Sequence, residues 1–287
     1  MKLGPPRRLD YLVIGHVTHD VAPGGGFTYG GTATYAARTA QALGCRVGIL
    51  TSTANHDAAA FACAEVFNVP TPSTTIFENR YSHTARQQVI HSVASSLSPH
   101  HVPPDWQNAA IVHIGPVARE CDPALVNAFP DAFVGVTPQG WMRHWDHQGH
   151  VRRAEWADAE TVLSTANAVV LSIEDVGGDV ALVERWARWC ALLVLTRGAA
   201  GCTVYVDGAA RDVPGFPTAE VDPTGAGDVF TAAFFVQLAR GATPQDAARL
   251  ANCVAATSVT RVGLDGIPTP EEIARCLRTT PFSTIEP

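Results

Sequence analysis

Short apolar runs alternate with stretches of helical spacing along this chain, and the alternation strongly constrains its fold. Runs typical of buried strands occupy residues 11–15, 46–51, 110–114, 133–137, 168–171 and 192–196. Helical patterns lie between them, for example at residues 32–43, which precede the helix-stopping Gly44, and at residues 178–189. Strands that alternate with helices of about 10–15 residues form βαβ units around a parallel sheet. We therefore predict an α/β fold with a doubly wound, mostly parallel sheet.

Three segments depart from this rhythm. Residues 74–81 and 86–94 have extended patterns separated by polar turn residues, and residues 20–29 form a Gly-rich connection that contains Pro23. Such segments are typical of a small β-rich element at the edge of an α/β body. The alternative interpretation is a surface hairpin without a role.

The length sets the domain organisation. At roughly 150 residues per domain, 287 residues correspond to one large domain or two modest ones. We expect one domain over residues 1–287, with lid segments inserted at about residues 18–30 and 74–95. The chain is long enough to bury a substantial core without disulfides or metals.

Charge and composition exclude several classes of protein. Hydrophobic residues make up 46% of the chain and charged residues 16%, so it is not disordered. The formal net charge is −7, with no basic stripe, so we expect neither a nucleic acid nor a membrane surface as a partner. The longest apolar stretches, such as residues 229–239, are too short to cross a bilayer.

The cysteines indicate a compartment. Seven cysteines are scattered without a CxxC pair, which argues against zinc ribbons and thioredoxin-type sites. The N-terminal residues do not form the charged and then apolar pattern of a signal peptide. We therefore expect a cytoplasmic protein in a reducing compartment.

Lysine is nearly absent. Lys2 is the only lysine, and the other 19 basic residues are arginines. This excludes a Walker A motif, a protein-kinase strand lysine and a Schiff-base lysine. Any phosphate chemistry must use backbone amides, arginine or a metal ion. We see no arginine cluster in the sequence that would bind a second phosphate, which disfavours a phosphorylated sugar as substrate.

The strongest motif is the string DPTGAGD at residues 222–228, which precedes the apolar run at residues 229–239. Glycines allow a sharp turn at this helix start, and we expect a Cβ to be obstructed at both Gly225 and Gly227. The first-turn amides of Gly225, Ala226 and Gly227 then form an anion hole for a terminal phosphate.

Asp228 follows this anion hole directly. A carboxylate at that position can accept the proton of a substrate hydroxyl. An ordinary N-capping aspartate after a Gly loop is the alternative, but the full seven-residue string disfavours it.

The DPTGAGD string with its helix resembles the C-terminal signature of the ribokinase/PfkB family of small-molecule kinases. Asp20 is similar to the family's aspartate that binds substrate hydroxyls. Gly30, Gly31 and Thr32 resemble the start of its di-glycine motif, where backbone packs against the substrate. The resemblance implies a ribokinase-like fold and binding of ATP and a small polyol, and it allows a homodimer that forms through the lid.

Further matches follow in the family's order. Thr196, Arg197, Gly198 and Gly201 resemble its T-x-G-x-x-G nucleotide loop. Asn252 falls where the family lines the adenine pocket. The matches span more than 230 residues, which makes them far more specific together than any one alone.

The resemblance also implies cations. The family's N-x-x-E motif, which positions Mg²⁺ through water, stands here as residues 172–175, with Glu174 and Asp175 as the carboxylates. Asp222 and Thr224 would help to bind a monovalent cation such as K⁺ near the anion hole.

Two departures point to a substrate class. Tyr35 replaces the family's usual sugar-binding Asn, and Ser172 leads the acidic motif. Both features resemble the myo-inositol kinase branch. A tyrosine ring face also suits the C–H surface of a cyclitol. We therefore expect an ATP-dependent kinase of a cyclitol or unusual sugar, with Arg86 as a further substrate-binding candidate or a solvated strand charge.

Two other functions remain open. A nucleoside kinase of the same fold would need a flat aromatic pocket, for which Phe77 and Tyr81 are candidates. A non-catalytic binding homologue is disfavoured because Asp228 is intact. The histidines at positions 144, 147 and 150 are interpreted as a surface loop, since zinc needs three or four converging ligands.

Overall fold

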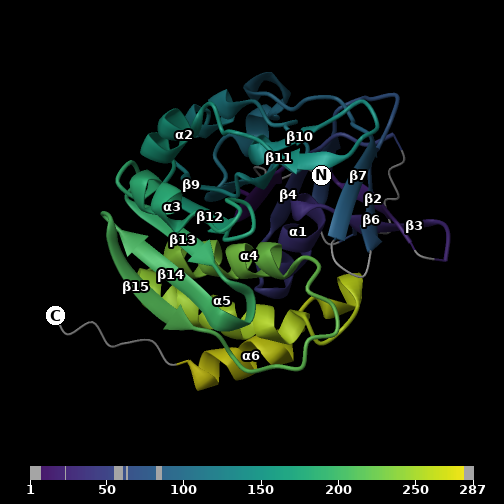
Figure 1. The fold of residues 1–287 in the computed structure, drawn as a ribbon. Helices are drawn as coiled ribbons and strands as arrows, with labels where there is room; N and C mark the ends of the chain where they lie inside the picture. Colours follow the sequence, from purple (N-terminus) through teal and green to yellow (C-terminus); the bar gives the residue numbers. More distant parts are fainter. Residues whose placement is uncertain (1–7, 23, 55–60, 63, 82–85, 281–287) are drawn as a thin grey trace, which may run out of the picture.

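A nine-stranded sheet forms the centre of the protein (Figure 1). The computed structural model describes residues 8–22, 24–54, 61–62, 64–81 and 86–280, with only the backbone at Tyr81 and Arg86. In spatial order the strands are β15 (Ala209–Pro214), β14 (Gly201–Val206), β13 (Leu192–Thr196), β12 (Ala168–Ser172), β9 (Phe133–Val136), β8 (Ile111–Ile114), β1 (Tyr11–Ile14), β4 (Val47–Thr51) and β5 (Glu65–Asn68). The strands from β13 to β5 pair in parallel, and β14 and β15 add to one edge antiparallel. The predicted doubly wound, mostly parallel α/β fold is confirmed.

Helices cover both faces of this sheet. One face packs against α1 (Thr32–Ala42), α4 (Ala226–Ala239), α5 (Pro244–Ser258) and α6 (Pro270–Thr279). The other face packs against α2 (Ala159–Thr165) and α3 (Val180–Trp186). Strand β1 illustrates why both faces of the sheet are covered. Its successive side chains point to opposite faces, so Tyr11 and Val13 enter one apolar core, and Leu12 and Ile14 enter the other.

Short 3₁₀ turns connect several of these elements. They are η1 (Pro99–His101), η2 (Pro104–Trp106), η3 (Pro123–Asn127), η4 (Gln139–Met142), η5 (Gly198–Ala200) and η6 (Gly263–Gly266). Helices α5 and α6 begin at side-chain caps. Thr243 caps α5 by accepting from the amide of Asp246, and Thr269 with Glu272 forms a capping box on α6.

A second sheet stands beside the body, in the order β3 (Phe27–Gly30), β2 (Thr18–Val21), β6 (Thr75–Tyr81) and β7 (Arg86–Ser92) (Figure 1). Its strands come from the two regions that we expected to be β-rich. A hairpin of β10 (Arg143–Trp145) and β11 (Val151–Arg153) joins this small sheet, through a bridge between Val89 and His150. That hairpin contains the histidine-rich loop, which was not predicted to contain strands.

The histidine loop binds its own carboxylate. His150 contacts Asp146 both through its backbone amide, at 3.1 Å, and through its ring nitrogen, at 3.2 Å. Within the described residues, no group of three or more His, Cys, Asp or Glu side chains is arranged to hold a metal ion.

A disulfide between Cys253 and Cys276 ties α5 to α6. The scattered cysteine spacing did not predict this pairing, because the two residues meet only when the helices pack. None of the helices in the described part of the chain is long and apolar enough to cross a membrane.

Candidate active site

One pocket of about 640 Å³ lies where the parallel strands end and faces the small sheet. Thr137, Ser172 and Thr196 line it from the carboxyl ends of β9, β12 and β13, and Thr18 and Asp20 line it from β2. Open α/β sheets bind ligands at this edge, where loops from adjacent strands converge. The pocket brings together most of the residues that the sequence singled out.

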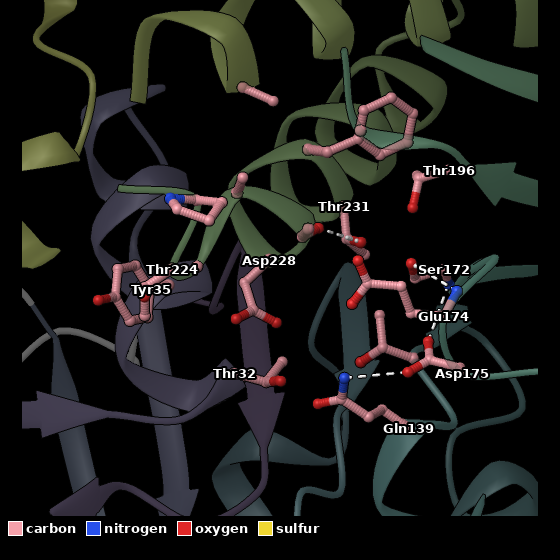
Figure 2. Close-up of a pocket in the computed structure, with 18 of the residues that line it drawn as sticks. Thr32, Tyr35, Gln139, Ser172, Glu174, Asp175, Thr196, Thr224, Asp228 and Thr231 are labelled. Carbon is pink, nitrogen blue, oxygen red and sulfur yellow. Dashed lines mark hydrogen bonds between the residues drawn. The ribbon is translucent and has the colours of Figure 1, made fainter. Parts of the chain in front are cut away.

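Asp228 lies in the first turn of α4 and points into this pocket (Figure 2). Burial raises its pKa to about 6, partly opposed by a hydrogen bond from Thr32 and by the positive charge of Arg143. At neutral pH the carboxylate is therefore mostly ionised, yet its pKa is near enough to 7 for efficient proton acceptance.

The two glycines of the predicted anion hole, Gly225 and Gly227, differ in backbone conformation and in the space around them. Gly225 has φ 77°, in the left-handed region, and a Cβ there would fall 2.2 Å from the ring of Tyr35. Gly227 is helical, and a Cβ there would meet nothing within 4 Å. Our expectation that a Cβ is obstructed at both positions is therefore wrong for Gly227. The open space beside Gly227 is pocket space at the N-terminus of α4, where an anion would bind.

The di-glycine motif packs against Asp20. A Cβ at Gly30 would lie 2.5 Å from the Asp20 carboxylate, and Gly31, with φ 84°, caps α1. Thr18 donates to Asp20 over 3.3 Å. Glycine is required at position 30 because a Cβ would collide with the Asp20 carboxylate, and it is favoured at position 31 because the backbone there is left-handed.

Tyr35 lies on α1 and is only 4% exposed. Its ring packs on Gly225, and burial together with the carboxylates of Asp228, Asp20 and Asp222 raises its pKa well above 10. The sequence argument gave the ring face to the substrate. In the structure that ring supports the anion-hole loop, and Tyr35 also lines the pocket. Its contact with the substrate stays a prediction.

The acidic turn after β12 has two different carboxylates. Asp175 accepts from Gln139 at 3.0 Å and from the amide of Ser172 at 2.8 Å, and burial raises its pKa. Glu174 is exposed and points into the space between this turn and α4 (Figure 2). Mg²⁺ is usually held by one or two carboxylates, waters and substrate phosphates, and Glu174 fits that role. Asp175 orders the turn and also lines the pocket, and its predicted part in binding Mg²⁺ stays a prediction.

The part of the pocket that we predicted to bind nucleotide is built from β13, β14 and α5. Gly201, with φ 90°, allows the backbone of β14 to approach Val213, and Asn252 donates to the carbonyls of Val213 and Pro214 at 3.2 and 3.1 Å. The amide of Asn252 thus fixes the wall of the pocket. Other lining residues in this part of the pocket are Thr196, Gly198, Ala199, Gly215, Phe216, Thr218, Glu220, Ala255, Ala256 and Val259.

Arg197 does not line this pocket, although we predicted it to bind nucleotide. Its guanidinium pairs with Asp212 on β15, at 3.4 Å. Arg197 is the second residue of the T-x-G-x-x-G loop, and its side chain turns toward Asp212 on the edge strand β15. It is therefore not a residue of the pocket.

Asp222 orders the anion-hole loop. Its two carboxylate oxygens accept from the amides of Thr224, at 3.0 Å, and Gly263, at 2.8 Å. These bonds connect the loop before α4 to turn η6. A monovalent cation at Asp222 and Thr224 stays a prediction.

Arg86 is the first residue of β7, and its side chain lies outside the described residues. Sequence reasoning missed two residues that line the pocket: Gln139, the first residue of turn η4, and Arg143, which follows this turn. It also missed Asn79 and Gln88 of the small sheet. The signal available was a polar PQG segment directly after the apolar run at residues 133–137.

The chain matches known proteins over most of its length. The model of the pfkB family of carbohydrate kinases matches residues 171–271. An inositol 3-kinase from Zea mays is 30% identical over 281 residues, which cover 89% of this chain and 73% of the maize protein. A cytidine kinase from Thermococcus kodakarensis is 27% identical over 261 residues, covering 84% and 93%.

Solved structures share the fold. A pyrophosphate-dependent kinase of the ribokinase family, complexed with a pyrophosphate analog and myo-inositol, superposes with a TM-score of 0.78 at 22% identity, covering 92% of this chain and 99% of that one. A putative ribokinase II from E. coli, in complex with ATP and Mg²⁺, has a TM-score of 0.69 at 19% identity, covering 94% and 99%.

Fold, site and comparisons together define a small-molecule kinase. The chain belongs to the pfkB family of carbohydrate kinases, and it resembles the inositol kinases among them.

Proposed function

We propose that this protein is an ATP-dependent kinase that phosphorylates a hydroxyl of a ring polyol, with myo-inositol as the representative substrate. One observation carries the proposal: Asp228 lies beside the first-turn amides of α4, in the same pocket as Asp20. A binding protein would need the anion hole but not a carboxylate with a pKa of about 6 at its edge.

The residues divide the reaction between them. Asp20 holds hydroxyls of the polyol, and Asp228 accepts the proton of the attacking hydroxyl. The amides of residues 225–227 stabilise the charge on the transferred phosphoryl group. When bound, Mg²⁺ neutralises charge on the donor phosphates, and Glu174 would hold it through water. The small sheet, through Asn79 and Gln88, would act as a lid that excludes water.

The donor half of the pocket supports ATP. Beyond the anion hole, Gly198 of turn η5 and Ala255 and Ala256 of α5 line a part of the pocket to which we assign the nucleoside. Pyrophosphate, the donor in one structural neighbour, would leave this extension unused.

The proposal of a ring polyol no longer rests on the ring face of Tyr35. It now rests on the similarity to inositol 3-kinase and on the polar pair Asn79 and Gln88, which are bonded to each other at 3.2 Å in the pocket. A cytidine kinase activity is the second candidate, favoured by the relative from Thermococcus kodakarensis and by Phe77 in the pocket lining.

The pocket lining also corrects one expectation. We expected no arginine cluster, but Arg143, Arg152 and Arg153 all line the pocket. Phosphorylated sugars therefore belong among the test compounds.

The decisive experiment compares kcat/KM for myo-inositol, ribose, fructose 6-phosphate, adenosine and cytidine, with ATP or pyrophosphate as donor. We expect myo-inositol with ATP to give the highest value. A compound of another class ahead by about tenfold would overturn the polyol assignment, since that ratio corresponds to about 1.4 kcal/mol of transition-state binding. The same preparation tests the predicted homodimer by light scattering.

A further inference from the structure

Arg143 is a fixed cation in the pocket to which the proposed mechanism has given no role. It follows turn η4 directly and begins β10. Its guanidinium lies over the ring of Phe77, 5.4 Å from the centroid, and one terminal nitrogen donates to the carbonyl of Val117 at 2.9 Å. These two contacts hold the planar group in one orientation, as bidentate recognition of phosphate oxygens requires.

Arg143 is connected to both ends of the reaction site. Its charge lowers the pKa of Asp228, the proton acceptor. Gln139, at the start of the same turn η4, bonds to Asp175 at 3.0 Å. Turn η4 therefore links the cation to the donor side, while Phe77 links it to the acceptor side.

The neighbouring arginines are engaged differently. Arg152 is 71% exposed and pairs with Asp146 at 3.6 Å, and Arg153 donates to the carbonyl of Val176. With Lys2 as the only lysine, no lysine in the described residues can supply a cation to the transferred group. Of the three arginines that line the pocket, Arg143 is the one that packs on Phe77 and directly follows turn η4.

We propose that Arg143 is a catalytic residue that binds the equatorial oxygens of the phosphoryl group during transfer, an inference that rests on the proposed kinase function. The substrate hydroxyl oxygen forms a bond to phosphorus as the bond to the donor's bridging oxygen breaks, and that oxygen leaves with the electron pair. The hydroxyl proton passes to Asp228. Arg143 stabilises the charge that spreads over the three remaining oxygens, a contact stronger in the transition state than in either bound substrate.

The test compares Arg143→Met, Arg143→Lys and Arg240→Met. Arg240 is the matched control, because it also donates to a backbone carbonyl, that of Leu43 at 2.7 Å, but lies at the far end of α4. Arg143→Met should lower kcat by about 10³-fold or more, the effect of removing a cation from a phosphoryl transition state. KM for the acceptor and the Kd of ATP should change by less than about threefold.

Two readouts distinguish catalysis from structural support. Removing the positive charge should raise the pKa of Asp228 and move the acid limb of kcat/KM to higher pH. Arg143→Lys, which keeps the charge, should recover at least about tenfold over Arg143→Met and leave the acid limb in place. If Arg143→Met does not fold, the lysine variant and chemical rescue of Arg143→Ala by guanidinium ion take its place.

Unchanged kcat with a raised acceptor KM would overturn the proposal, because it would mean that Arg143 acts only by holding Phe77. A loss in Arg240→Met equal to that in Arg143→Met would overturn it as well. All assays use the acceptor that the wild type phosphorylates best, so a failed polyol assignment leaves this test intact.

Discussion

The ring of Tyr35 packs directly on the backbone of Gly225, so close that a methyl group there would come within 2.2 Å of a ring carbon. Tyr35 belongs to α1, near the start of the chain, and Gly225 to the loop before α4. The anion hole is therefore held in shape by a side chain from the substrate-binding half of the protein. This contact explains why the two glycines of the loop should respond differently to substitution.

Gly225→Ala should lose both activity and stability. The left-handed φ costs an L-residue about 1–2 kcal/mol, and the clash with Tyr35 adds to it. Gly227→Ala should keep or raise stability by up to about 1 kcal/mol, because alanine is favoured in a helix. Its methyl group would nevertheless enter the open space beside residue 227, where we expect the phosphate to bind, and lower kcat. Thermal unfolding and kcat for the two variants check this contrast, and equal loss of stability in both would contradict it.

Asp228→Asn should be more stable than the wild type and almost inactive. The native pKa of about 6 lies above the ordinary value of 3.8, so ionisation of Asp228 at pH 7 opposes folding by about 1–3 kcal/mol. The stability gain should therefore be present at pH 7 and shrink as the pH falls from 6 toward 4. We expect kcat to fall by at least about 10²-fold. A kcat within about tenfold of wild type would remove Asp228 from the role of base.

The wild-type pH profile should lose activity below about pH 6, as Asp228 becomes protonated. Thr32→Val removes a hydrogen bond that lowers this pKa, so its acid limb should lie at higher pH. Profiles of kcat/KM measured in parallel test the shift. Superimposable acid limbs would show that Thr32 does not tune the base.

Asn252→Ala should weaken ATP binding while sparing the acceptor. The variant leaves the carbonyls of Val213 and Pro214 without the Asn252 amide, which costs about 1–3 kcal/mol and loosens the donor wall. We expect a higher KM for ATP, an unchanged KM for the acceptor and a lower melting temperature. A rise in the acceptor KM alone would be inconsistent with the placement of Asn252.

Reduction should destabilise the protein by about 2–4 kcal/mol if the bond between Cys253 and Cys276 forms in solution, as expected for a closed loop of this size. Cys253→Ser should have the same melting temperature with and without dithiothreitol. Thiol titration of the unfolded protein provides the direct measurement. Seven reactive thiols before reduction would show that the bond is absent.

Much of the fold followed from local patterns. The apolar runs became strands within one or two residues, because a parallel sheet covered on both faces requires continuous apolar segments. The DPTGAGD string placed Asp228 and the amides correctly at a helix start, because glycine and helix signals are local. Local patterns do not show which side chains face each other across the pocket. The positions of Tyr35, Arg143 and Arg197 depended on contacts between distant segments, and so did the Cys253–Cys276 pair.

The pocket is assembled from two consecutive parts of the chain. Its acceptor half and Arg143 come from residues up to 153, whereas the anion hole, the acidic turn and the donor wall come from residues 170–259. The family match at residues 171–271 lies in the second part. The acceptor side chains Asp20, Asn79 and Gln88 therefore lie in a different part of the chain from the loop at residues 222–228. Tyr35 and Arg143 connect the two parts, so an exchange of acceptor residues that spares these two leaves the supports of the phosphate-binding loop in place.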